Sequence, residues 1–337
     1  MTDLSTRYMG IDLKNPIIVG ASALTSDLDS IVKLEKAGAG ALVTKSLFEE
    51  EIQLEQFKFD EDLGEGNCRY AEMITLRPNL KFAGPAEHLM WVGLAKKAVN
   101  IPVIASLNAV NPATWLEYAK RLEAAGVDAL ECNLFASPGN IEKKGADIEN
   151  EQIELVRKLK KSVSIPVGVK LSSCYSNIEN VVRQMDQAGA DGFVLFNRLA
   201  EPDIDIVAEK HLYPFNFSHG TDHRIPLRYA GLLEGAIKAD ICCASGVFQG
   251  EDVIKMILAG AAAIQTVSAI FDMGYGHIQK MLADIQAWMD RKGYKNISDF
   301  RGKLSKRHSN DPFAYNHAQY ARLLMNSDVL MNDSPGG

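Results

Sequence analysis

The chain has few cysteines and no apolar run as long as a membrane helix needs. None of its five cysteines, among 337 residues, forms a C-x-x-C pair. The sequence therefore predicts no iron–sulfur, zinc or other metal site within this chain. No apolar stretch approaches the roughly 20 residues that cross a bilayer, so no membrane contact is expected. Residues 1–7 lack the charged-then-apolar pattern of a signal peptide, which favours a cytoplasmic protein.

Positive charge is also scarce. Lys and Arg total 36 against 43 Asp and Glu, which gives a net charge of -7. No basic stripe is present, so nucleic acid is not an expected partner. Acidic residues gather at Glu49–Glu51 and Asp60–Asp62. We expect both groups to be solvated rather than to bind a metal.

Four Ala-Gly turns each end a predicted helix and lead directly into an apolar strand. Their glycines are Gly38, Gly126, Gly189 and Gly260. Glycine adopts the left-handed conformation that closes a helix, so the chain can enter the next strand at once. Repeated units of this kind indicate a parallel sheet wrapped by helices.

Periodicity extends this pattern to eight strand–helix units, which predict an α/β fold, the (β/α)8 TIM barrel. The alternative is a doubly wound sheet, but no G-x-G-x-x-G turn follows the first strand. The expected strands cover residues 16–20, 41–45, 102–106, 129–133, 166–171, 192–197, 240–244 and 262–267. The expected helices cover residues 27–37, 85–99, 112–125, 149–163, 178–188, 251–259 and 276–292, with another from 227. The barrel would occupy residues 1–308, with a long insertion at 46–84, a lid loop at 198–226 and a tail at 309–337.

Two lysines lie at the ends of apolar strands, where barrel enzymes build their sites. Lys45 ends the second strand and Lys170 the fifth. A lysine in such a place is costly unless an anion meets it, so a bound anionic group is expected. The alternative is a purely structural pairing with Glu131 or a position at the solvated rim.

The last two units carry small residues where helices begin. Ser245 and Gly246 follow the seventh strand, and Ser268 follows the eighth. Free backbone N–H groups at such positions bind phosphate. Asn133 and Asn197 end the fourth and sixth strands, and their amides suit a planar heterocycle because each offers donors and an acceptor.

These residues, with four short motifs, resemble the FMN-dependent dihydroorotate dehydrogenases, and especially the bacterial dihydroorotate dehydrogenase-like proteins. The motifs are Thr44–Ser46, Gly168–Leu171, Phe196–Arg198 and Gly250–Val253. The resemblance implies a soluble, class 1-like flavoprotein of pyrimidine biosynthesis that passes hydride from a CH–CH group to FMN. It also implies FMN contacts at Ala21, Ser22, Lys45, Ser46, Asn133, Lys170, Asn197, Gly246 and Ser268, and at Asn108 by likeness to the membrane-associated class.

The chain departs from the family around the substrate. The family follows its strand-four asparagine with Leu-Ser-Cys-Pro-Asn, in which Cys or Ser is the base. Here that position falls on Ala136, which takes no proton. The family's substrate-binding loop reads Asn-Ser-Met-Gly-Leu-Pro-Asn, and in this chain only Arg77–Asn79 resembles its end. The remaining candidates for the base are Ser137 and Cys174, with Lys170 beside them in the catalytic set. Two histidines of the lid loop, His219 and His223, are further candidates for moving protons.

Several readings of the function stay open at this point. The substrate is dihydroorotate or a related cyclic or unsaturated compound. Electrons would leave through a small acceptor or an electron-accepting partner protein. A second copy of the chain, in a homodimer, is another candidate partner. One alternative is a Schiff-base lyase or aldolase that uses Lys170 as its amine. Another is a protein that binds FMN without turnover.

Overall fold

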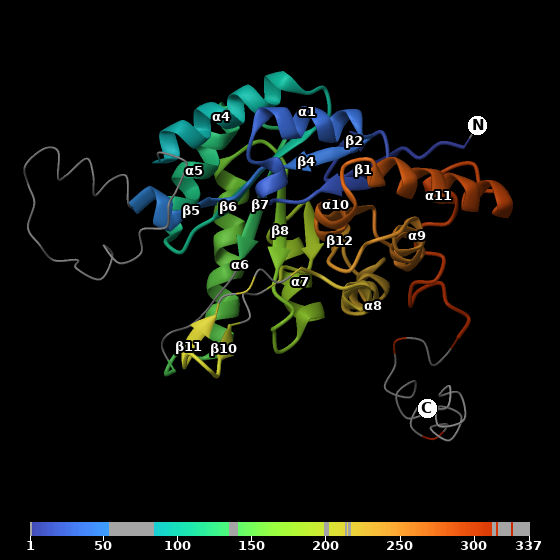
Figure 1. Cartoon of the computed structure of the whole chain (residues 1–337). Coiled ribbons are helices and arrows are strands. Elements are labelled where there is room, and N and C mark those ends of the chain that lie inside the picture. Colours follow the sequence, from blue (N-terminus) through green and yellow to red (C-terminus); the bar gives the residue numbers. More distant parts are fainter. Residues whose placement is uncertain are drawn as a thin grey trace, which may run out of the picture.

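The computed structural model describes residues 2–53, 84–134, 141–198, 202–212, 214, 217–311, 315 and 325. Within them a closed parallel barrel confirms the predicted TIM-barrel fold (Figure 1). The strands run in the order β4-β3-β13-β12-β9-β8-β7-β6, and β4 pairs with β6 to close the ring. Their bounds are β3 Ile17–Val19, β4 Ala41–Val43, β6 Val103–Asn108, β7 Ala129–Leu134, β8 Val167–Leu171, β9 Gly192–Leu195, β12 Asp240–Ala244 and β13 Ala263–Thr266. A short strand, β5 (Leu47–Phe48), extends the pairing of β6.

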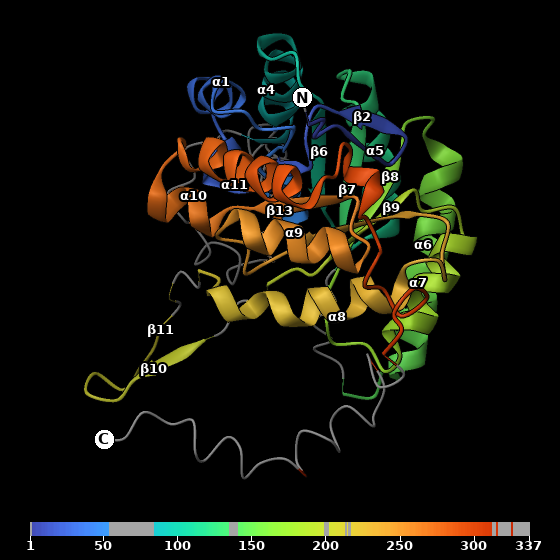
Figure 2. The same ribbon diagram turned by 90° about the vertical axis from the view of Figure 1, so that its right-hand side faces the viewer.

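Helices surround this ring (Figure 1 and Figure 2). They are α1 Leu28–Lys36, α4 Gly84–Ala98, α5 Pro112–Ala124, α6 Gly145–Ser162, α7 Ile178–Gln187, α8 Arg224–Leu233, α9 Gly250–Ala259, α10 Ser268–Met273 and α11 His277–Lys292. The predicted starts of α6 and α8 were late. Asp147 favours the first turn of α6 through the helix dipole, and Pro226 is tolerated in the first turn of α8. In the part of the chain that the structure describes, none of the helices is both long and apolar enough to cross a membrane.

A hairpin that the sequence did not predict closes the amino-terminal end of the barrel. It pairs β1 (Thr6–Tyr8) with β2 (Ile11–Leu13), and Tyr8 and Met9 join the apolar cluster inside the ring. Glycine on two neighbouring strands makes room for it. A Cβ on Gly192 would lie 2.6 Å from Met9 Cγ, and one on Gly168 would lie 2.8 Å from Met9 Sδ. With this end filled, a ligand site is expected at the opposite, carboxyl end of the strands.

The expectation that Glu49–Glu51 is solvated was wrong for two of its residues. Glu49 is only 5% exposed. Its carboxylate accepts hydrogen bonds from the backbone N–H groups of Val110 and Asn111, just before α5. Backbone N–H groups where a helix begins have no partner within the helix, and a buried carboxylate can satisfy them. Glu51 forms an ion pair with Lys45. The acidic run at Asp60–Asp62 lies outside the described residues.

The described part of the predicted lid loop contains regular structure. An antiparallel hairpin joins β10 (Asp203–Asp205) to β11 (Lys210–Leu212), and the 3-10 turn η2 (Gly220–His223) leads into α8. The predicted insertion at 46–84 lies outside the described residues over 54–83. Of the predicted tail, only residues 309–311, 315 and 325 are described.

Candidate functional site

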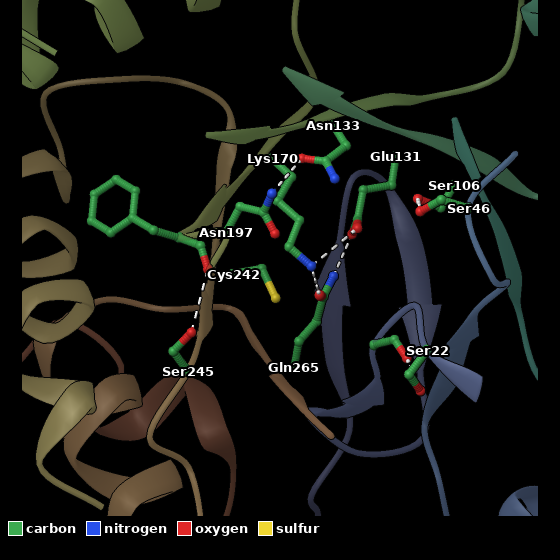
Figure 3. A network of polar contacts seen from close by, with 12 residues as sticks. Ser22, Ser46, Ser106, Glu131, Asn133, Lys170, Asn197, Cys242, Ser245 and Gln265 are labelled. Atoms are coloured by element: carbon green, nitrogen blue, oxygen red, sulfur yellow. Dashed lines mark hydrogen bonds and ion pairs between the residues drawn. The ribbon is translucent and has the colours of Figure 1, made fainter. Parts of the chain in front are cut away.

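The structure brings together three of the predicted site residues at the carboxyl ends of adjacent strands (Figure 3). Asn133 on β7 stands opposite Lys170 on β8 in the strand register. Asn197 follows β9, and its Nδ2 donates a hydrogen bond to Asn133 Oδ1 at 3.0 Å. The two amides and the lysine thus share one region of the barrel mouth.

Lys170 is held by two side chains inside the barrel. Its Nζ donates to Gln265 Oε1 at 3.1 Å and lies 3.5 Å from Glu131 Oε1. Gln265 Nε2 in turn donates to Glu131 Oε2. The pairing with Glu131, which the sequence left open as the structural alternative, is therefore present. Gln265 was missed, although its alternation with the inward-facing Ala263 of β13 points it into the barrel.

The predicted phosphate-binding turn has an unusual backbone. Ser245 and Gly246 have φ values of +77° and +70°, a conformation that favours glycine. A Cβ on Gly246 would lie 2.2 Å from the backbone N of His223. The lid segment therefore packs directly on this turn. The lid also contacts the start of α10, where Ser268 Oγ accepts hydrogen bonds of 3.0 Å from the N–H and the hydroxyl of Ser218.

An ion pair fixes the lid to the end of β9. Arg198 NH1 pairs with Asp222 of η2, and the same carboxylate accepts the N–H of His219 at 2.8 Å. His223 Nδ1 lies 4.0 Å from Asp252 on α9. Arg198 was noted in the sequence only within the motif Phe196–Arg198, and its ion pair with the lid was not predicted. Both histidines lie in the braced segment, and their part in proton movement stays a prediction.

Lys45 lies in a second cluster, at the end of β4. Its Nζ is 3.3 Å from Glu51 Oε1. The adjoining cavity is lined by Ser26, Lys45, Glu51, Gly84, His88 and Trp91. His88 Nε2 and Trp91 Nε1 are buried and have no hydrogen-bond partner among the described residues. The sequence analysis missed both, because the inward face of α4 is defined only by its contacts with α1, α5 and β6.

His88 gives a prediction for the pH dependence of stability. Burial, followed by the charge of Lys45, lowers its pKa from 6.5 to about 4. The folded chain thus binds fewer protons than the unfolded chain between these values. The neutral His88 side chain therefore makes its full contribution to the free energy of unfolding above pH 6.5. This contribution falls by up to about 3 kcal/mol as the pH approaches 4. In thermal unfolding, His88→Gln is expected to lose less stability than the unchanged protein between pH 7 and pH 4.5. Equal losses would contradict this assignment.

The other predicted site residues occupy varied positions. Ser22 caps the turn η1 (Ala23–Thr25) after β3, where Ala21 also lies. Asn108 ends β6, and Ser46 Oγ is 2.7 Å from Ser106 Oγ. Cys174 is exposed in the loop after β8. Ser137 lies outside the described residues, as do Ala136 and Arg77–Asn79.

Three cysteines, Cys132, Cys242 and Cys243, are buried in the core. Burial, followed by the nearby charge of Glu131, raises the pKa of Cys132 to about 12. A thiol with such a pKa is inert at neutral pH, so these three side chains fill space rather than react.

The donor set at the mouth fits the FMN that the resemblance implies. The ammonium of Lys170 has three N–H donors. In the described part of the chain, two of them face Gln265 and Glu131, so the third can donate to a ligand. Amides at Asn133 and Asn197 offer the mixed donors and acceptors that a flavin edge needs. The glycine at 246 and the hydroxyls of Ser245 and Ser268 suit a phosphate. Cation, amides and phosphate ligands thus occur on one rim.

Comparison with known proteins agrees with this fit. A family model described as dihydroorotate dehydrogenase matches residues 86–289. A protein of Methanosarcina mazei is 31% identical over 303 residues, covering 87% of this chain and 92% of the relative. A protein of Thermoplasma volcanium is 27% identical over 314 residues, covering 91% and 100%. One of Anoxybacillus flavithermus is 27% identical over 321 residues, covering 90% and 96%. All three are named dihydroorotate dehydrogenase B (NAD(+)), catalytic subunit. The chain therefore belongs to the dihydroorotate dehydrogenase family, whose members are FMN-dependent oxidoreductases acting on CH–CH groups.

Proposed function

We propose that this chain oxidises dihydroorotate, or a closely related cyclic substrate, at the carboxyl mouth of its barrel, as a step of pyrimidine biosynthesis. The observation that carries the proposal is the junction of Asn133, Lys170 and Asn197 on three adjacent strands in a chain of this family. A lyase that uses Lys170 is disfavoured, because the relatives are oxidoreductases and the lysine already pairs with Glu131.

Each group at the mouth has a defined task in this proposal. Lys170 would hold the flavin and would stabilise negative charge on its ring. Asn133 and Asn197 orient planar rings by hydrogen bonds. Bound FMN supplies the hydride acceptor. The phosphate ligands are Ser245, Gly246 and Ser268, and the remaining proposed contacts are Ala21, Ser22, Lys45, Ser46 and Asn108.

The base that removes the substrate proton is proposed to be Ser137 or Cys174. The family's own base position is Ala136, and Cys174 is exposed after β8, the strand that carries Lys170. Ser137→Ala and Cys174→Ala test the two candidates separately. The variant that removes the base is expected to keep the flavin spectrum of the unchanged protein. General bases contribute about 10²–10⁴-fold, so flavin reduction should slow by at least about 100-fold. Stopped-flow absorbance measures this rate. Wild-type rates in both variants would refute the two candidates.

The substrate is tested by anaerobic bleaching of the bound flavin. Dihydroorotate is expected to bleach it within one turnover, faster than dihydrouracil or dihydrothymine at equal concentration. Adding orotate to the chemically reduced protein is the reverse test. If another compound bleaches the flavin and dihydroorotate does not, the reaction class stands and the substrate is wrong. A flavin that no donor bleaches favours a binding protein without turnover.

We further propose that electrons leave through a separate subunit in the cytoplasm. The relatives named above are catalytic subunits of NAD(+)-type enzymes, which supports a partner protein for this chain. A second copy of the chain is the other proposed partner. Co-purification from the native source, followed by mass spectrometry, tests both.

A further inference from the structure

A buried carboxylate lies beneath the lysine at the mouth, one step deeper in the barrel. Glu131 stands two residues before Asn133 on β7, so both side chains point to the same face of the strand. It is 2% exposed. Its Oε1 accepts no hydrogen bond from the described residues and faces Lys170 Nζ at 3.5 Å (Figure 3).

Stability alone does not account for this carboxylate. A charged pair taken out of water gains little, and apolar side chains of similar volume commonly stabilise a core as well or better. Apolar residues fill the ring on the amino-terminal side of this pair, and Cys242, Val194 and Ala263 belong to one buried cluster there. An acidic residue at this place therefore needs a reason connected with the lysine that it faces.

Gln265 fixes the geometry of the pair. It accepts from Lys170 at 3.1 Å through Oε1 and donates to Glu131 through Nε2, so one amide joins the two charged groups across β8, β13 and β7. Because the amide spans both, the carboxylate stays at a set distance from the ammonium. The charge that Lys170 presents to the mouth is thereby partly neutralised.

We propose that Glu131, held by Gln265, is a positioning residue that lowers the reduction potential of the bound flavin by neutralising part of the charge of Lys170. The inference rests on the proposed flavin site. Reduction adds negative charge to the flavin ring, and an ammonium beside the ring stabilises that charge. A carboxylate 3.5 Å from the ammonium opposes this effect in a poorly solvated interior.

The test is the midpoint potential of FMN in the purified holoprotein, measured by equilibration with a reference dye. Glu131→Gln keeps the shape and removes the charge. It is expected to raise the potential by at least the equivalent of a tenfold change in the affinity ratio of reduced to oxidised flavin, about 30 mV for a two-electron couple. An unchanged or lowered potential would overturn the proposal.

A second variant keeps the test decisive if Glu131→Gln does not fold. Glu131→Asp retains the charge but withdraws it by one methylene, so the potential should rise in the same direction by a smaller amount. A potential equal to that of the wild type in Glu131→Asp would overturn the proposal.

The matched control is Glu49→Gln, since Glu49 is another buried carboxylate, bonded to the N–H groups before α5. This variant should lose thermal stability without a change of potential. An equal shift of the FMN midpoint potential in Glu49→Gln would show that loss of stability alone changes this potential, which contradicts a specific role for Glu131. If the wild type carries no FMN, the proposed function itself fails; if it carries FMN and the Glu131 variants match it, only this inference fails.

Discussion

Lys170→Ala is expected to lose most of its bound FMN. The change removes the cation at the mouth and leaves Glu131 buried without its partner. A hydrogen bond to a charged group contributes about 1.5–3 kcal/mol, so the FMN affinity should fall about 10- to 150-fold. Fluorescence titration of the apoprotein with FMN measures the dissociation constant, and the absorbance of the purified protein measures occupancy.

The control for this variant is Lys160→Ala. Lys160 pairs with Asp191 at 2.6 Å, just before β9 and therefore at the opposite end of the barrel. It should lower stability slightly and leave the FMN affinity unchanged. Full flavin occupancy in Lys170→Ala would show that this lysine is wrongly placed in the site.

Gly246→Ala is expected to have the second large effect. The residue has a φ of +70°, and a Cβ there would lie 2.2 Å from the backbone of the lid at His223. Either the turn or the lid must move. The turn carries the proposed phosphate ligands Ser245 and Gly246, and the lid hydrogen-bonds the third, Ser268, through Ser218. The FMN affinity should fall by at least about tenfold, since loss of even one good hydrogen bond to phosphate costs about 1.5 kcal/mol.

Gly293→Ala separates the close approach from backbone strain. Gly293 has a φ of +75° at the end of α11, and a Cβ there would meet nothing within 4 Å. Both variants incur about 1–2 kcal/mol for placing an alanine in the left-handed conformation. Only Gly246→Ala should also weaken FMN binding. Equal FMN affinities in the two variants would contradict a tight contact between lid and turn.

Much of the fold could be predicted because its signals are local. The Ala-Gly turns and the apolar strands of Ala41–Val43 and Cys242–Ala244 belong to single units that repeat, so the barrel follows from counting them. The hairpin at Thr6–Leu13 could not be predicted. Its strands are only three residues long, and it is stabilised by contacts with Gly168 and Gly192 far along the chain.

The residues of the site also fall into those that could be predicted from the sequence and those that could not. Asn133, Lys170 and Asn197 could be found because strand ends in a barrel must meet at one mouth. Gln265 and the buried state of Glu49 could not, since each depends on a partner more than 60 residues away: Gln265 joins Glu131 across 134 positions. Glu49 is 61 positions from Val110. Sequence spacing carries no sign of such pairs.

The most direct test of the account is the FMN content of the purified protein, measured by the visible spectrum and by release of the flavin on denaturation. A site built from Lys170, the two asparagines and the turn at Ser245–Gly246 predicts an equimolar amount of FMN. A folded, colourless protein that takes up no FMN when it is added would contradict the account.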